Sequence, residues 1–226
     1  MNNKIKFSLN FNKFKTASNL NAKSFYAAIA SKNYDEKIKQ GFTDATLIGS
    51  VVSATFLEKI NAYYSIWDEN TGSMRKESYE MIKQVPFYID FSKQILAVEG
   101  TTSNFNSIKK ILRNLYYAEF TYYQISFTPL EIIQLFSEDK ILIEIEQVTI
   151  NDFKYENMFL GTYTAKMIRP DIDILMHFSP NITKIKSIIE IDGFKISFVI
   201  SKNNSATIVC SADIKIALLE YLSNKF

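Results

Sequence analysis

Several residue types on which active sites depend are scarce in this 226-residue chain. It contains one cysteine, one histidine, four prolines and six glycines. A single cysteine, Cys210, excludes a disulfide within the chain, which is typical of proteins in a reducing compartment. Because Cys210 lies in an apolar run, we expect a buried and inert thiol. The low proline and glycine contents argue against a disordered or fibrous chain.

The same scarcity excludes several kinds of catalytic site. One histidine and one cysteine cannot supply the four ligands of a usual zinc site. His177 lies in an apolar run without an accompanying Gly-x-Ser-x-Gly turn, so we expect a packed or rim histidine. The glycine-rich loops that bind nucleotide phosphates are absent. We therefore predict no cofactor, no metal and no enzymatic activity.

Long apolar runs are missing as well. No segment approaches the ~18 apolar residues of a membrane-spanning helix. The N-terminal segment alternates between polar and apolar residues and lacks the apolar core of a secretory signal. These features predict a cytoplasmic protein that does not associate with membranes.

The apolar residues that are present, with 18 Phe and 13 Tyr, follow clear periodic patterns. Alternation predicts strands, and apolar residues three or four apart predict helices. The expected strands cover residues 5–11, 46–67 (two strands), 87–91, 95–98, 121–127, 141–148, 185–191, 194–200 and 206–210. The expected helices cover residues 21–40, residues 105–115 with Thr102 or Ser103 as cap, a short segment from Thr128, and residues 213–223. Residues 74–85 fit a strand or a short helix, and residues 161–170 fit a loop or lid.

This succession of elements favours an α+β fold. Helices follow strands, but hairpins are present too, so we predict mixed or antiparallel sheets, rich in hairpins, with helices packed on one face. Neither a repeat nor a linker divides the chain. We predict a single domain over residues 1–226, with two subdomains divided near residue 150 as the alternative.

Positive charge is concentrated in the first half of the chain. Residues 1–115 carry a net charge of +6, and residues 116–226 carry −4. The helix of residues 105–115 has a basic side opposite its apolar side, and the small residues before it offer backbone N–H groups to a phosphate. Lys4, Lys6, Lys13 and Lys15 of the basic N-terminal segment extend this surface, whereas Glu99 opposes it. The candidate nucleic-acid site consists of Lys93, Thr101, Thr102, Ser103, Lys109, Lys110 and Arg113.

Two other functions fit parts of the sequence. The first is a protein-interaction component or inhibitor of a defence complex, marked by exposed aromatic residues. Its candidate patch consists of Tyr116, Tyr117, Tyr122 and Tyr123. The second is a metal-dependent nuclease using Asp171, Glu190, Asp192 and Lys195, although Asp192 stands where the PD-(D/E)xK pattern requires lysine. We interpret Glu144 and Glu146 as an exposed strand face.

The order of features between residues 87 and 148 resembles two protein families. The hairpin end at residues 97–100, the helix start at residues 101–104 and the segment of residues 124–130 resemble RexA-type phage-exclusion proteins. The strand pair, amphipathic helix, strand, proline-marked turn and helix, with residues 207–222, are similar to RdgC-type recombination-associated proteins. Residues 151–179 have no counterpart there. The resemblance implies a homodimer that binds double-stranded DNA largely independently of sequence, with a role in phage defence or exclusion.

Overall fold

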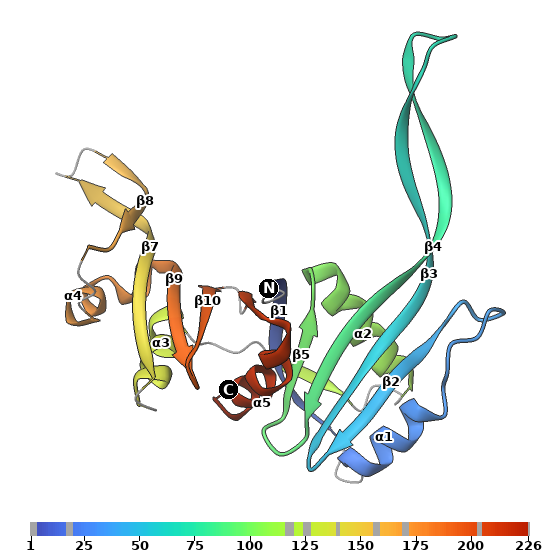
Figure 1. Cartoon of the computed structure of the whole chain (residues 1–226), viewed down its shortest axis with the longest axis horizontal. Helices are drawn as coiled ribbons and strands as arrows, with labels where there is room; N and C mark the ends of the chain where they lie inside the picture. Colours follow the sequence, from blue (N-terminus) through green and yellow to red (C-terminus); the bar gives the residue numbers. More distant parts are fainter. Residues whose placement is uncertain are drawn as a thin grey trace.

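The computed structural model describes residues 4–16, 20–115, 120–123, 128–138, 141–155, 159–168, 172–202 and 205–225. Within these residues, eleven strands form one antiparallel sheet in the order β2-β3-β4-β5-β1-β11-β10-β9-β7-β8, and β6 pairs with the end of β1 (Figure 1). The strands are β1 (Lys4–Lys15), β2 (Gln40–Ile48), β3 (Val51–Asp68), β4 (Ser73–Asp90), β5 (Ile95–Glu99), β6 (Thr121–Tyr123), β7 (Leu142–Tyr155), β8 (Phe159–Lys166), β9 (Ile182–Ile191), β10 (Phe194–Ser201) and β11 (Ser205–Ser211). The α-helices are α1 (Ala22–Ala30), α2 (Thr102–Leu115), α3 (Pro129–Glu138), α4 (Ile172–His177) and α5 (Lys215–Lys225).

The helices cover opposite faces of the sheet in its two halves. In β5, Leu96 and Val98 belong to the core that α1 and α2 complete, whereas Ile95 and Ala97 belong to the core that α3, α4 and α5 complete. Because successive residues of a strand point to opposite faces, the two cores lie on opposite sides of the sheet. On the α2 side, no described helix covers β11, β10, β9, β7, β8 or the first half of β1.

The antiparallel, hairpin-rich sheet agrees with the sequence prediction, but the expectation that helices pack on one face is wrong. The reason lies in β1, whose Leu9 joins one core and whose Phe14 joins the other. The residue pattern within each helix identifies its apolar side, but not which face of a shared sheet that side meets. The domain division near residue 150 stays a prediction.

Two further element predictions are wrong. The helix expected over residues 21–40 ends at Ala30, and Gly41 lies within β2 instead of ending a helix. A Cβ atom at Gly41 would lie 2.3 Å from the Tyr34 Cα, so only glycine lets the two backbone segments approach this closely. The two strands expected over residues 46–67 are present, because β2 ends at Ile48 and β3 occupies nearly all of the remaining segment. Residues 161–166, expected as part of a loop or lid, pair with β7 as β8.

Other local predictions are confirmed. Thr128 and Glu131 form the expected helix start, because the Glu131 N–H donates to the Thr128 hydroxyl at 3.2 Å and the Thr128 N–H donates to the Glu131 carboxylate at 2.6 Å. Asp192 and Gly193 form the turn between β9 and β10, both with positive φ. Residues 74–85, for which the sequence left two possibilities, form part of β4.

The longest strands, β3 and β4, form a hairpin that leaves the sheet as a twisted arm (Figure 1). Their pairing is continuous from Val51 opposite Asp90 to Asp68 opposite Ser73. The base of the arm carries core residues such as Phe56 and Phe87, whereas its outer part carries exposed Tyr63 and Trp67. None of the described helices has the length and apolar character needed to cross a membrane.

Candidate functional site

The basic helix predicted from the sequence is α2. Its Phe105, Ile108 and Leu112 are buried, and Lys110 and Arg113 are exposed on the other side. Lys109 and Arg113 come together over one aromatic ring: the Lys109 Nζ lies 5.2 Å and the Arg113 Cζ lies 5.5 Å from the centre of the Tyr122 ring. These cation–π contacts hold two of the three predicted cations on one flank of the helix.

The Tyr122 ring is itself half-buried. It stacks on Phe120, with ring centres 6.0 Å apart, and its hydroxyl has no hydrogen-bond partner among the described residues. Burial raises the pKa of the Tyr122 phenol, and Arg113 opposes that rise. The phenol therefore stays neutral and leaves the positive charge of Lys109 and Arg113 uncompensated.

The start of α2 is held by backbone and amide contacts. Gly100 has a φ of +101°, and a Cβ atom there would lie 2.2 Å from the Asn104 amide nitrogen. The Asn104 side chain donates to the Glu99 carbonyl at 3.2 Å, and its backbone N–H donates to the Thr101 hydroxyl at 3.4 Å. Thr101 therefore occupies the capping position that the sequence assigned to Thr102 or Ser103.

Lys93 lies in the turn between β4 and β5, which a buried carboxylate organises. The Asp90 Oδ1 atom accepts hydrogen bonds from the Ser92 N–H at 2.8 Å and the Lys93 N–H at 3.2 Å. It also accepts from the hydroxyls of Ser92 at 2.7 Å and Ser50 at 3.0 Å. Asp90 is only 4% exposed, so this cluster fixes the turn while the Lys93 side chain stays exposed.

The predicted site is thus divided into two groups. Thr101, Thr102 and Ser103 lie at the start of α2, and Arg113 lies roughly 17 Å further along the helix axis at 1.5 Å per residue. Lys93 lies at the far end of β5, where the adjacent Gln94 carbonyl accepts a hydrogen bond from the Phe14 N–H. A single phosphate cannot contact both groups, but an extended polyanion can.

Glu99, which opposed the site in the sequence, is neutralised on the other face of the sheet. Its Oε1 atom lies 2.6 Å from the Lys215 Nζ of α5 and accepts a hydrogen bond from the Tyr88 hydroxyl at 2.9 Å. Among the described residues, Lys93, Lys109, Lys110 and Arg113 form no ion pair with a carboxylate. The cations of the predicted site are therefore not cancelled by described acidic side chains.

A second basic surface lies beside α2, on the helix-free face of β1, β11, β10, β9, β7 and β8. Strand register places polar residues in rows across this face. One row consists of Lys166, Gln147, Lys186, Val199, Thr207 and Ser8. The next row consists of Thr164, Thr149, Lys184, Ser201, Ser205 and Asn10. We call these two rows, with Lys4, Lys6 and Lys195 on the same face, the lysine–hydroxyl floor.

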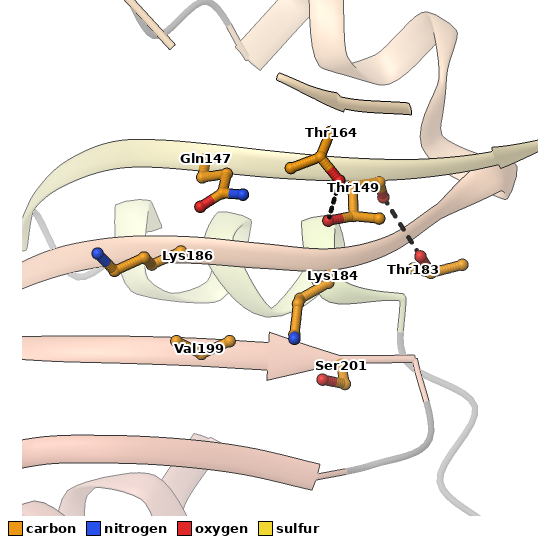
Figure 2. Close-up of a pocket in the computed structure, with 8 residues that line it drawn as sticks. All are labelled: Gln147, Thr149, Thr164, Thr183, Lys184, Lys186, Val199 and Ser201. Atoms are coloured by element: carbon orange, nitrogen blue, oxygen red, sulfur yellow. Dashed lines mark hydrogen bonds between the residues drawn. The ribbon is translucent and has the colours of Figure 1, made fainter. Parts of the chain in front are cut away.

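Figure 2 shows part of this floor, with Lys184 and Lys186 on β9 among the hydroxyls of β7, β8 and β10 and a helix behind the strands. The residues drawn there line an open hollow of ≈ 550 Å³. Thr149 and Thr164 share a hydrogen bond of 3.3 Å across β7 and β8. Hydroxyls and lysines are the groups with which proteins commonly contact phosphate oxygens.

The floor meets the start of α2. Lys6, Ser8 and Asn10 of β1 line the same hollow of ≈ 670 Å³ as Thr101 and Thr102. The Asn10 amide donates to the Gly100 carbonyl at 2.7 Å, which joins the floor to the loop before the helix. The floor and the flank of α2 therefore form one continuous polar surface at this point.

Acidic residues on the floor are outnumbered. The face carries Glu144, Glu190 and Glu146, against the lysines at positions 4, 6, 166, 184, 186 and 195. Glu146 forms an ion pair of 2.7 Å with Lys186, and Glu190 lies opposite Lys195. A net positive charge remains, and it is largest on β1, which carries Lys4 and Lys6 and no acidic residue.

Most of the floor cannot be recognised from the sequence, for a physical reason. Lys4 and Lys6 belong to the basic N-terminal segment, but the remaining lysines belong to the second half of the chain, whose net charge is −4. They meet β1 only because β11 pairs with it, with Lys6 opposite Val209 and Ser8 opposite Thr207. A usable signal was present in β9, where Lys184 and Lys186 alternate with buried Ile185.

The other candidate residues do not converge. Asp171, Tyr116 and Tyr117 lie outside the described residues, and no group of three or more His, Cys, Asp and Glu side chains in the described part fits a metal ion.

His177 is exposed at the end of α4, at the rim that the sequence suggested. Cys210 is buried as expected, and burial raises the pKa of its thiol. Tyr123 is 44% exposed beneath the Lys15 ammonium.

Comparison with known proteins adds no family to this description. No protein-family model matches the chain, and no curated protein is significantly similar to it.

Proposed function

We propose that this chain is a non-enzymatic, cytoplasmic protein that binds double-stranded DNA through the phosphate backbone, largely independently of sequence. The observation that carries the proposal is the lysine–hydroxyl floor, which meets α2 where Thr101 and Thr102 line a hollow with Lys6. Lys109 and Arg113 extend the cationic surface along the helix. A surface of this size, lined with lysines and hydroxyls, can contact several phosphates of one duplex at the same time.

Duplex is favoured over single-stranded nucleic acid because the floor rows contain no aromatic side chain. Proteins that bind single strands without sequence preference stack bases on exposed aromatic residues. The floor offers hydroxyls, amides and ammonium groups, which contact the backbone instead of base faces. A role in phage defence or exclusion is what the RexA-type and RdgC-type resemblance adds to this proposal.

The decisive measurement is duplex affinity across a salt series for three triple variants. Lys109/Lys110/Arg113→Ala removes the helix cations, and Lys6/Lys184/Lys186→Ala removes floor cations. Lys23/Lys32/Lys37→Ala removes the same charge from exposed positions outside both surfaces and outside the β3–β4 arm, and serves as the control. We expect each of the first two variants to weaken binding and to reduce the salt slope by about 2–3, at about 0.9 per lost phosphate contact.

Equal loss in the control variant would show that net charge, and not this surface, determines binding. Unchanged affinity in both site variants would refute the proposal. If only the floor variant loses affinity, the floor is the binding surface and α2 is not part of it. A protein-interaction function remains the alternative, and the outer part of the β3–β4 arm favours it for that region of the molecule.

A further inference from the structure

The outer part of the β3–β4 arm is a surface that DNA binding does not use. From the Ile60–Met81 pair to the Asp68–Ser73 pair, neither strand pairs with a third described strand. A two-stranded hairpin is at best marginally stable in water, and three or more strands are needed for independent stability. The arm nevertheless carries large exposed apolar side chains, including Tyr63 at 69%, Trp67 at 60% and Met74 at 61% exposure.

The charge of the arm points to a protein partner. Residues 57–84 contain four basic and five acidic residues, so the arm has no excess of positive charge for a polyanion. Exposed tyrosine, tryptophan and methionine are enriched where proteins meet proteins. Both signs of charge are interspersed along β4, which allows the strand to complement another copy of itself.

The longer uncovered edge belongs to β4. Pairing between β4 and β5 begins only at Phe87, which leaves Ser73–Pro86 without a neighbouring strand on that side among the described residues. On β3, the pairing with β2 reaches Glu58, and the Lys59 N–H still bonds the Lys39 carbonyl at 2.8 Å. Unpaired edges of this kind accept an additional strand through main-chain hydrogen bonds.

We infer that the β4 edge pairs antiparallel with β4 of a second copy of this chain, with the two-fold axis at Ser78. A two-fold axis perpendicular to the paired strands keeps facing side chains on the same side of the sheet. Residues that face one another must then be separated by an even number of positions. The axis therefore passes through a residue and not between two residues.

The charges along β4 determine through which residue the two-fold axis passes. An axis at Lys76, Glu77 or Glu80 places that charged residue opposite its own copy. An axis at Tyr79 places Arg75 opposite Lys83. An axis at Ser78 avoids every such clash, because Lys76 faces Glu80 on both sides of the axis and Met74 faces Ile82. Among the axes between Lys76 and Glu80, this register alone matches opposite charges without opposing like charges.

The resulting unit is a four-stranded sheet of two arms, β3-β4 joined to β4-β3 of the second copy. The exposed Met74 and Ile82 side chains, 61% and 43% exposed in the single chain, become cross-strand neighbours. The uncharged outer stretch of β3, residues 60–67, supplies no comparable selection of register. The β4 edge therefore has both the longer unpaired backbone and the charge pattern that determines the pairing register.

Disulfide trapping tests the axis. Facing residues of antiparallel strands have Cα atoms about 4.5–5.5 Å apart, within the range of a disulfide. We expect Ser78→Cys to give a covalent dimer under mild oxidation, since the native Cys210 is buried and does not compete. Ser65→Cys is the matched control, because Ser65 lies on the same side of the arm but on β3. Trapping with Ser65→Cys, or with neither variant, overturns the inference.

Charge exchange tests the register independently of cysteine chemistry. Lys76→Glu and Glu80→Lys each place like charges opposite one another in a homodimer, and we expect each to weaken self-association about tenfold. A mixture of the two variants restores both opposite-charge contacts and should dimerise like the wild type in sedimentation equilibrium. Glu80 also pairs with Lys59 at 2.9 Å within one chain, so the mixture is the informative sample.

A mixture that associates no better than either variant alone would refute the register. None of the substituted residues belongs to the floor or to α2. Failure of this inference therefore shows in sedimentation and trapping, whereas failure of the DNA proposal shows in the salt series.

Discussion

At the scale of single residues, Asp90 is the buried polar group on which the conformation of the β4–β5 turn depends. Its Oδ1 atom accepts four hydrogen bonds, two of them from backbone N–H groups. We expect Asp90→Ala to lower the free energy of unfolding by about 2–3 kcal/mol, because the donors lose a charged acceptor in a buried place. Asp90→Asn, which keeps an acceptor oxygen, should cost less. Urea denaturation measures both changes.

Asp68 provides the control for this prediction. It also caps a turn, but through one backbone bond, from the Asn70 N–H at 3.0 Å, and at an exposed site. Asp68→Ala should change stability by less than about 1 kcal/mol. Equal effects at Asp90 and Asp68 would show that burial of the carboxylate does not determine the cost.

At the scale of elements, the sequence predicted the strands and α2 well because their periodicity is local. Phe105, Ile108 and Leu112 follow helical spacing, and the structure buries all three. The face that a helix covers, by contrast, is a long-range property. Residues of α2 meet Phe14 and Phe120 only after β1 has paired with β5 and β6. For the same reason Lys186 and Ser8, 178 positions apart, could not be placed in one row from the sequence.

The arm is the element whose length the sequence left undetermined and whose removal is most informative. Replacing residues 60–81 by Asn-Gly joins Lys59 to Ile82, which face one another across the arm, through a two-residue turn. We expect the shortened protein to keep the unfolding free energy of the full chain within about 1 kcal/mol, because the lost ion pairs are exposed or half-buried and such pairs contribute little. Thermal and urea unfolding of the two proteins check this.

Two outcomes of that deletion would distinguish a role of the arm in stability from a role in self-association. A large loss of stability would show that the arm supports the core of α1 and α2 directly. Retained stability with loss of dimer in sedimentation would assign the arm to association alone, as the two-fold pairing through Ser78 requires.

At the scale of the whole molecule, the floor sets the length of duplex that one chain contacts. Six strands from β1 to β8 span five intervals of about 4.8 Å, or roughly 24 Å. At about 3.4 Å per base pair, this width corresponds to roughly 7 base pairs of duplex lying across the strands. Contact with Lys109 and Arg113 on the flank of α2 adds a few more.

We therefore expect the affinity of one chain for blunt duplexes to rise steeply up to about 10 base pairs and then only in proportion to the number of overlapping sites. Fluorescence anisotropy with duplexes of increasing length, on the arm-shortened protein to exclude dimer effects, measures this directly. The Lys6/Lys184/Lys186→Ala variant should lose the steep part of the curve, because the removed ammonium groups are those that contact successive phosphates across the floor. A steep rise that continues well beyond this length would mean that the duplex follows a surface larger than the floor and α2.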